Sequence, residues 1–149
     1  MADVLIILGS KSDMKAGEKC QETLNKLEIS NQLEVSSAHR QPERTHELAS
    51  TAKDGKVKVI ICMAGMSAAL PGVVASKTDL PVLGVPLSGS SLNGLDALFS
   101  IVQMPKGVPV GTLALDSHGA VNSALLAARI IALSDSSVYN RIDQYRKSM

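Results

Sequence analysis

Short, continuous aliphatic runs alternate along the chain with segments in which apolar residues recur every three or four positions. The first run, 4–8, is apolar throughout and ends at a Gly-Ser pair. Such a run predicts a strand buried on both faces, as in a parallel sheet. From Asp13 onward, apolar residues such as Cys20 and Leu24 recur at helical spacing among charges. This pattern predicts an amphipathic helix, whose first turn Ser12 or Asp13 can cap.

The same strand-and-helix unit recurs four more times. The predicted strands are 32–35, 57–63, 81–85 and 110–115, and the predicted helices are 42–53, 67–77, one within 92–103, and 118–133. Alternation with short loops implies right-handed crossovers and a parallel sheet covered on both sides. We therefore predict one α/β domain over residues 1–149, with a doubly wound, flavodoxin-like, five-stranded sheet between two layers of helices.

The last segment, 136–149, predicts a further, C-terminal helix. Tyr139, Ile142 and Tyr145 stand at helical spacing among charges, so this helix has an apolar edge. The helix predicted at 118–133 is apolar on nearly every side, which is more than one sheet face requires in so small a domain. We expect both apolar surfaces to be buried between the subunits of a homo-oligomer.

The balance of charges and the two cysteines exclude several classes of protein. The 15 Lys and Arg nearly cancel the 14 Asp and Glu, which argues against a dedicated nucleic-acid or membrane-surface binder and favours a small-molecule partner. No apolar run approaches the roughly 18 residues of a membrane span, and the first residues lack the pattern of a signal peptide. Cys20 and Cys62 have no partner at metal-ligand spacing, which predicts reduced core thiols. We expect a cytoplasmic protein without a metal.

The loops that follow the strands are the candidate site, because ligands of parallel α/β sheets bind beyond the carboxyl ends of the strands. Segment 9–13, Gly-Ser-Lys-Ser-Asp, joins a strand to a helix N-terminus, where backbone N–H groups attract an anion such as phosphate. It matches neither the dinucleotide fingerprint nor the Walker motif, so NAD and ATP are poorly supported. An ordinary capped loop is the alternative interpretation.

Segment 36–40 carries the candidate proton-transfer chemistry. His39 can exchange protons near neutral pH, and the neighbouring Arg40 offers a guanidinium fork for phosphate or carboxylate. The alternative is a surface loop with two polar residues. We expect His46 to be solvated on a helix and His118 to lie near a helix start. With no G-x-S-x-G motif, a hydrolase is not favoured.

Motifs at these same segments resemble one known family over nearly the whole chain. They are GSKSDM at 9–14, SSAHRQPER at 36–44, AALPG at 68–72, LPVLGVP at 80–86 and LNGLDALFSIVQMPKGVPVGTLA at 92–114. The family is that of the carboxyaminoimidazole ribonucleotide mutases of bacterial purine synthesis, also called the catalytic subunit of phosphoribosylaminoimidazole carboxylase. The last motif is long enough to be highly specific.

The resemblance implies a flavodoxin-like three-layer fold, an octamer with active sites between subunits, and no metal or organic cofactor. The implied reaction moves a carboxylate from the exocyclic nitrogen of the imidazole ribonucleotide to ring carbon 4. By position, the resemblance assigns ribose and phosphate binding to Ser10, Asp13 and Arg40, the lining of the site to Ser37, Gly65 and Leu70, and general acid–base catalysis to His39. We expect segment 103–105 to form a wall or lid that retains carbon dioxide.

Several positions depart from the mutase pattern and keep alternatives open. Mutases usually carry His at the place of Ala69 and Gly at the place of Met66. The related carboxylases, which use carbon dioxide directly, share Ser67 with this chain but usually have Lys in place of Arg40. Because Arg40 and segment 80–114 resemble the mutase, we predict a mutase. A direct carboxylase and a non-catalytic nucleotide-binding homologue are the alternatives.

Overall fold

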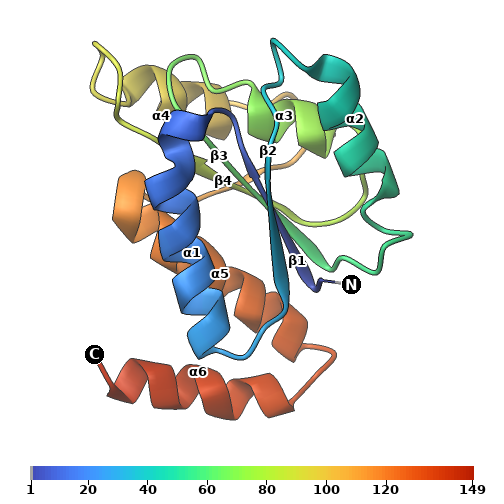
Figure 1. Cartoon of the computed structure of the whole chain (residues 1–149), viewed down its shortest axis with the longest axis vertical. Helices are drawn as coiled ribbons and strands as arrows, with labels where there is room; N and C mark the ends of the chain where they lie inside the picture. The colour runs from blue at the N-terminus through green and yellow to red at the C-terminus, as the bar shows by residue number, and fades with distance from the viewer. Residues whose placement is uncertain (1) are drawn as a thin grey trace.

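The strands form one parallel sheet with helices on both of its faces (Figure 1). The computed structural model describes residues 2–149. The strands are β1 (Val4–Leu8), β2 (Asn31–Val35), β3 (Val59–Ala64), β4 (Val82–Pro86) and β5 (Gly111–Thr112). They pair in the order β2-β1-β3-β4-β5. This order and the helical layers confirm the predicted five-stranded, flavodoxin-like architecture.

Six α-helices make up the outer layers. They are α1 (Met14–Lys26), α2 (Pro42–Thr51), α3 (Leu70–Ala75), α4 (Leu95–Val102), α5 (Asp116–Ala132) and α6 (Ser137–Lys147), and a 3₁₀ turn, η1 (Lys11–Asp13), precedes α1. Alternate residues of β1 point to opposite faces: Ile6 packs in the core with α1, α5 and α6, whereas Ile7 packs in the core with α2, α3 and α4. The sheet is therefore buried on both sides.

Several element boundaries differ from the sequence expectation, and three of these differences have a physical cause in the structure. The side-chain cap comes from Ser10, one turn earlier than expected, because η1 precedes α1. Helix α3 begins at Leu70 and not at residue 67, since Pro71 is tolerated only in the first turn. Strand β5 has only two residues, because the chain leaves the sheet edge to start α5 at Asp116.

The two apolar helices near the C-terminus are partly covered by their own chain. Ala124, Ala128 and Ile131 of α5 are buried in the core that β1, β3 and α1 share. Val138 and Ile142 of α6 are buried in the same core, so α6 packs across the end of α5 (Figure 1). Leu133 and Tyr139 stay exposed on these two segments, so the expectation that they meet another subunit stays a prediction.

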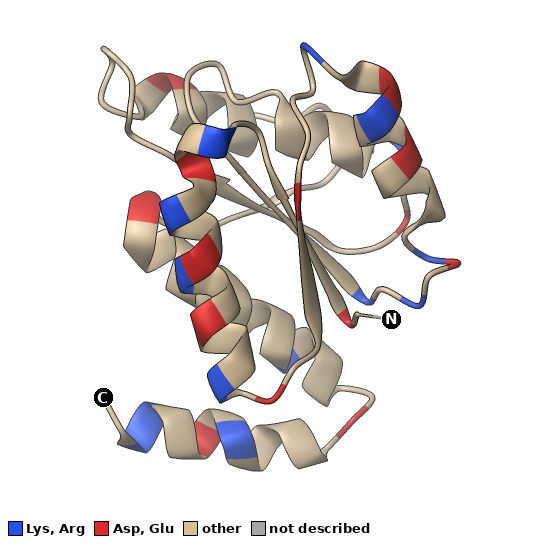
Figure 2. Ribbon diagram, viewed as in Figure 1, with Lys and Arg blue, Asp and Glu red and all other residues tan. Residues whose placement is uncertain are grey.

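The charged residues are spread over the surface (Figure 2). Lys and Arg alternate with Asp and Glu along α1 and α6, and no helix of the drawn chain is lined by one sign of charge. Both cysteines are free and buried, which confirms the predicted core thiols, and burial raises the pKa of Cys20 to about 12. Within residues 2–149, no helix is both long and apolar enough to cross a membrane.

Candidate functional site

A cavity of about 490 Å³ lies beyond the carboxyl ends of the first four strands. Strand β1 pairs with β2 on one side and with β3 on the other. The chain leaves β1 toward α1 on one face of the sheet and leaves β3 toward α3 on the other face. The loops after β1 and β3 therefore diverge, which opens the crevice in which α/β proteins bind ligands.

All seven residues assigned from the sequence line this cavity, namely Ser10, Asp13, Ser37, His39, Arg40, Gly65 and Leu70. The structure thus brings together three loops that lie up to 60 residues apart in sequence, while the chemical roles of the seven residues stay predictions. The lining also includes Gly9, Ser12, Ala38, Ala64, Met66, Ser67, Ala68, Ala69, Leu87 and Gly89. Most of these are small residues in the same loops, and their only signal in the sequence is that they follow predicted strands.

The loop after β1 forms a polar end of the cavity. The Ser12 N–H donates to Ser10 Oγ at 3.3 Å, and the Ser12 hydroxyl donates to the same oxygen at 3.0 Å. The Asp13 N–H donates to the Ser10 carbonyl at 3.1 Å, which closes η1. These bonds fix a strand-to-helix turn at the N-terminus of α1, where the helix dipole favours an anion.

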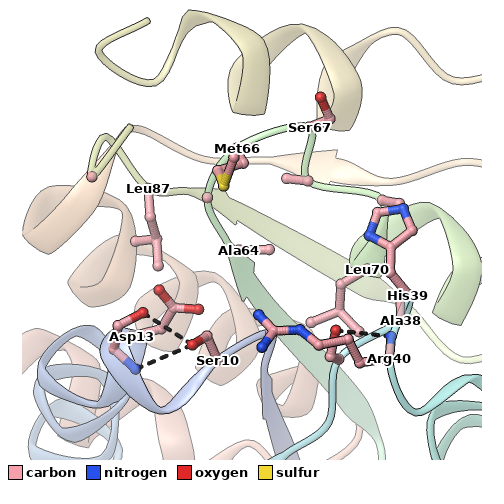
Figure 3. Close-up of a pocket in the computed structure, with 17 residues that line it drawn as sticks. Ser10, Asp13, Ala38, His39, Arg40, Ala64, Met66, Ser67, Leu70 and Leu87 are labelled. Carbon is pink, nitrogen blue, oxygen red and sulfur yellow. Dashed lines mark hydrogen bonds between the residues drawn. The ribbon is translucent and has the colours of Figure 1, made fainter. Parts of the chain in front are cut away.

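Asp13 contributes a carboxylate to this polar end and points toward the cavity beside Ser10 (Figure 3). Burial raises the pKa of the Asp13 carboxyl above its ordinary value of 3.8, and a backbone hydrogen bond from Ser10 acts in the opposite direction. No Lys or Arg of residues 2–149 forms an ion pair with Asp13. The group is therefore an acceptor that a ligand's hydroxyl groups can satisfy.

The loop after β2 presents His39 and Arg40 to the cavity. Ser37 shapes this loop, because its Oγ accepts the Arg40 N–H at 3.2 Å and its carbonyl accepts the Gln41 N–H at 2.8 Å. Both side chains are exposed, and within residues 2–149 neither is engaged in a hydrogen bond or ion pair. Figure 3 shows the Arg40 guanidinium extending toward Ser10 and the His39 imidazole standing on the opposite side of the cavity. The cavity thus has Ser10 and the Arg40 guanidinium at one end and an exposed imidazole at the other.

The loop after β3 supplies an apolar wall. Met66 adopts a left-handed backbone conformation with φ of 48°, and the Ala68 N–H donates to the Met66 carbonyl at 2.7 Å. This conformation costs a non-glycine residue about 1–2 kcal/mol. Met66 is nevertheless 70% exposed, whereas Leu70, at the start of α3, is buried. An exposed apolar side chain on a strained turn therefore borders the cavity.

The loop after β4 closes the remaining side. The Leu87 N–H donates to the Ala64 carbonyl at 3.0 Å, which extends the pairing of β3 and β4 into the cavity wall. The next residue, Ser88, is hydrogen-bonded to Asp116 at the start of α5. Sequence analysis did not identify Asp116, because its partner lies 28 residues away and neither residue belongs to a known motif.

Segment 103–105 does not line the cavity of the single chain. Met104 instead packs against α3, where a β-carbon added to Gly72 would lie 3.0 Å from Met104 Cε. The expected wall is therefore absent within one chain. The described residues 2–149 also contain no group of three or more His, Cys, Asp or Glu side chains that could hold a metal ion.

Comparisons with known proteins point to one family. Residues 3–149 match the family described as AIR carboxylase. The chain is 50% identical over 146 residues to the N5-carboxyaminoimidazole ribonucleotide mutase of Brucella melitensis, covering 98% of this chain and 90% of that protein. It is 46% identical to the enzyme of the same name from Haemophilus influenzae, covering 99% and 90%. The crystal structure of Treponema denticola PurE superposes with a TM-score of 0.87 at 30% identity, covering 97% and 89% of the two chains.

Proposed function

Since the chain belongs to the AIR carboxylase family, we propose that it is an N5-carboxyaminoimidazole ribonucleotide mutase of de novo purine biosynthesis. The proposal is that residues 1–149 form one catalytic domain that moves the carboxylate from the exocyclic nitrogen to ring carbon 4. Two relatives that are 46% and 50% identical over nearly the whole chain carry this name.

One observation carries the proposal: an anion-binding turn and a free histidine face each other across one cavity. A volume of about 490 Å³ is in the range of small-molecule sites and suits a mononucleotide. In this proposal the phosphate binds at Ser10 and the Arg40 guanidinium, and the Asp13 carboxylate accepts hydrogen bonds from the ribose hydroxyls. Ser37, Gly65 and Leu70 line the rest of the site.

His39 serves as acid and then as base. The protonated imidazole gives its proton to the carbamate nitrogen while the nitrogen–carboxyl bond breaks, which releases carbon dioxide. The enamine-like ring then donates an electron pair from carbon 4 to carbon dioxide, and a new carbon–carbon bond forms. The neutral imidazole removes the hydrogen from carbon 4 and regains its proton. Atoms and charge balance, and neither a metal nor an organic cofactor takes part.

The proposal also places the enzyme in the cytoplasm as a homo-oligomer, an octamer. The support comes from α4, on which Leu95, Phe99 and Val102 lie at helical spacing and are each about half exposed or more. Such a stripe of large apolar side chains is typical of a protein interface. A neighbouring subunit would also supply the wall that segment 103–105 does not provide within one chain.

A substrate assay with and without bicarbonate tests the proposed reaction. The mutase converts N5-carboxyaminoimidazole ribonucleotide to the 4-carboxylate in bicarbonate-free buffer, and aminoimidazole ribonucleotide alone gives no product. Turnover of aminoimidazole ribonucleotide that rises with bicarbonate would identify the direct carboxylase instead. Binding of the ribonucleotide without turnover of either substrate would identify a non-catalytic homologue.

A further inference from the structure

Met66 is unlike every other described residue with a left-handed backbone. Glycine aside, five residues have a φ between 48° and 65°, and the other four are Glu28, Lys56, Asn93 and Asp116. Those four are polar or charged, as expected where the chain turns in water. Met66 alone places a large apolar side chain on such a turn, and that side chain is 70% exposed.

The position of the strained turn beside the cavity points to a functional role. Met66 lines the cavity, and residues held in unfavourable backbone conformations concentrate at functional sites, where the surrounding structure holds them in place. The turn is followed by Leu70, which is buried at the start of α3, and it contains the hydrogen bond from the Ala68 N–H to the Met66 carbonyl. The Met66 side chain is thereby held at the cavity and kept out of the core.

The lining of the cavity is divided by polarity. Ser10, Asp13 and Arg40 lie along one side, and Met66 and Ala64 lie on the side across from them (Figure 3). A nucleotide whose phosphate occupies the polar end must extend its heterocycle toward the apolar side. The flat face of a heteroaromatic ring is the part of such a ligand that apolar side chains cover.

We propose that Met66 is a positioning residue that covers the face of the substrate's heterocycle and shields it from water, an inference that rests on the function proposed above. The thioether is flexible and polarisable, and it makes favourable contacts with aromatic rings. In the empty cavity the side chain stays exposed, and it becomes buried only when the ring lies against it. Covering the ring also keeps carbon dioxide beside carbon 4 between the two half reactions.

The test compares Met66→Gly, Met66→Leu and Lys56→Gly. Met66→Gly removes the side chain and relieves the left-handed strain, so the variant folds at least as well as the parent. We expect KM for N5-carboxyaminoimidazole ribonucleotide to rise about tenfold in Met66→Gly, and to change by less than about threefold in Met66→Leu, which keeps apolar volume. Lys56→Gly relieves the same strain on an exposed loop away from the cavity, so its KM stays at the parental value.

Measurements of product binding and of particle size distinguish a failure of the proposed Met66 role from a failure of the mutase proposal. The dissociation constant of the product, the 4-carboxylate ribonucleotide, is measured by calorimetry and should follow KM across the three variants. A parental KM and dissociation constant in Met66→Gly would overturn the role of Met66 while leaving the mutase proposal intact. A KM increase that appears only together with a smaller particle in light scattering would overturn it too, because Met66 would then be a subunit contact. A parent protein that binds the product but turns over no substrate would refute the mutase proposal instead.

Discussion

Ser88 and Asp116 join two segments at the rim of the cavity through a pair of hydrogen bonds. The Ser88 N–H donates to Asp116 Oδ1 at 2.9 Å, and the Ser88 hydroxyl donates to Oδ2 at 2.5 Å. Asp116 begins α5 with a left-handed backbone, φ of 56°. The pair ties the loop after β4, which carries the cavity residues Leu87 and Gly89, to a helix that is anchored in the core.

Breaking the Ser88–Asp116 pair should loosen this loop and weaken substrate binding. A hydrogen bond to a charged group contributes about 1.5–3 kcal/mol, so Ser88→Ala and Asp116→Asn should each raise KM several-fold while the particle size stays unchanged. Because the two residues act together, the double variant should lose less than the sum of the single losses. Ser91→Ala, at an exposed position in the same connection, is the matched control. Strict additivity in steady-state kinetics would show that the pair does not act as a unit.

Asp13 should lower the stability of the empty enzyme near neutral pH. Burial raises the pKa of its carboxyl in the folded state, so at pH 7 the fold holds a charge that it disfavours. Asp13→Asn should therefore raise Tm at pH 7. The gain should shrink as the pH falls through the raised folded pKa, and vanish below the ordinary value of 3.8, where both states are protonated.

The same substitution should impair binding, because the amide no longer offers two negatively charged acceptors to the ribose. We expect a higher Tm together with a higher KM, the combination typical of residues kept for function at some expense of stability. Asp54→Asn, on an exposed loop, controls for the change in net charge. A Tm difference that stays constant from about pH 7 to about pH 3 would contradict the assignment of the raised pKa.

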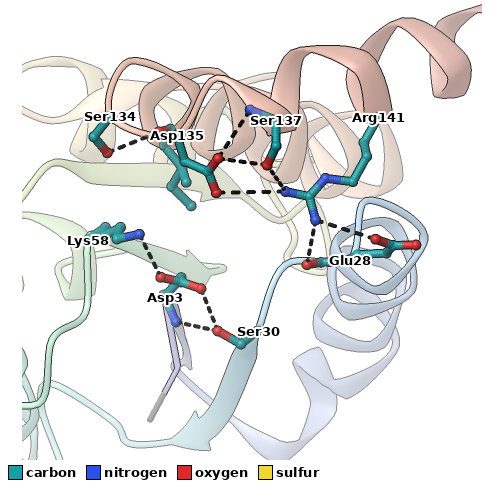
Figure 4. Close-up of polar contacts among 9 residues, drawn as sticks. Asp3, Glu28, Ser30, Lys58, Ser134, Asp135, Ser137 and Arg141 are labelled. Atoms are coloured by element: carbon teal, nitrogen blue, oxygen red, sulfur yellow. Dashed lines mark hydrogen bonds and ion pairs between the residues drawn. The ribbon is translucent and has the colours of Figure 1, made fainter.

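Arg141 should anchor α6 without affecting catalysis. Its guanidinium donates to the Glu28 carbonyl and to Ser137 Oγ, both at 3.2 Å, and lies 3.5 Å from the Glu28 carboxylate (Figure 4). Replacing it with Ala should reduce the free energy of unfolding by about 1–2 kcal/mol, measured by urea denaturation. Because α6 lies at the end of the molecule away from the cavity (Figure 1), kcat and KM should not change. Arg146→Ala, on the exposed side of the same helix, should leave stability unchanged.

The spacing of apolar residues predicted the strands and helices well, because local sequence largely determines where these elements form. The aliphatic run of β1 has the observed bounds Val4–Leu8, and Pro42 opens α2 as its preference for a first turn predicts. The sequence was less informative where contacts between distant segments determine the structure. Part of the apolar surface of α5 is covered by α6 within the chain, a contact that periodicity does not reveal.

The site could be predicted from the sequence where the residue types of a loop indicate a known chemical role. Segment 9–13 and the His39–Arg40 pair predicted an anion site and a proton-transfer group, and the topology of a parallel sheet brings these residues to one cavity, while their roles stay predictions. The link between Ser88 and Asp116 was not predictable, because it depends on the path of two loops 28 residues apart. The strain at Met66 was equally hidden, since a left-handed φ is a property of the folded backbone.

The most direct test of the account is the conversion of N5-carboxyaminoimidazole ribonucleotide to the 4-carboxylate by the parent enzyme and by His39→Asn. Asn keeps a polar side chain of similar reach but cannot exchange a proton near neutral pH, so turnover should fall by at least about 100-fold while product binding and particle size are kept. His46→Asn changes an exposed histidine of α2 that does not line the cavity, and it should retain full activity. Parental turnover in His39→Asn would contradict the central claim.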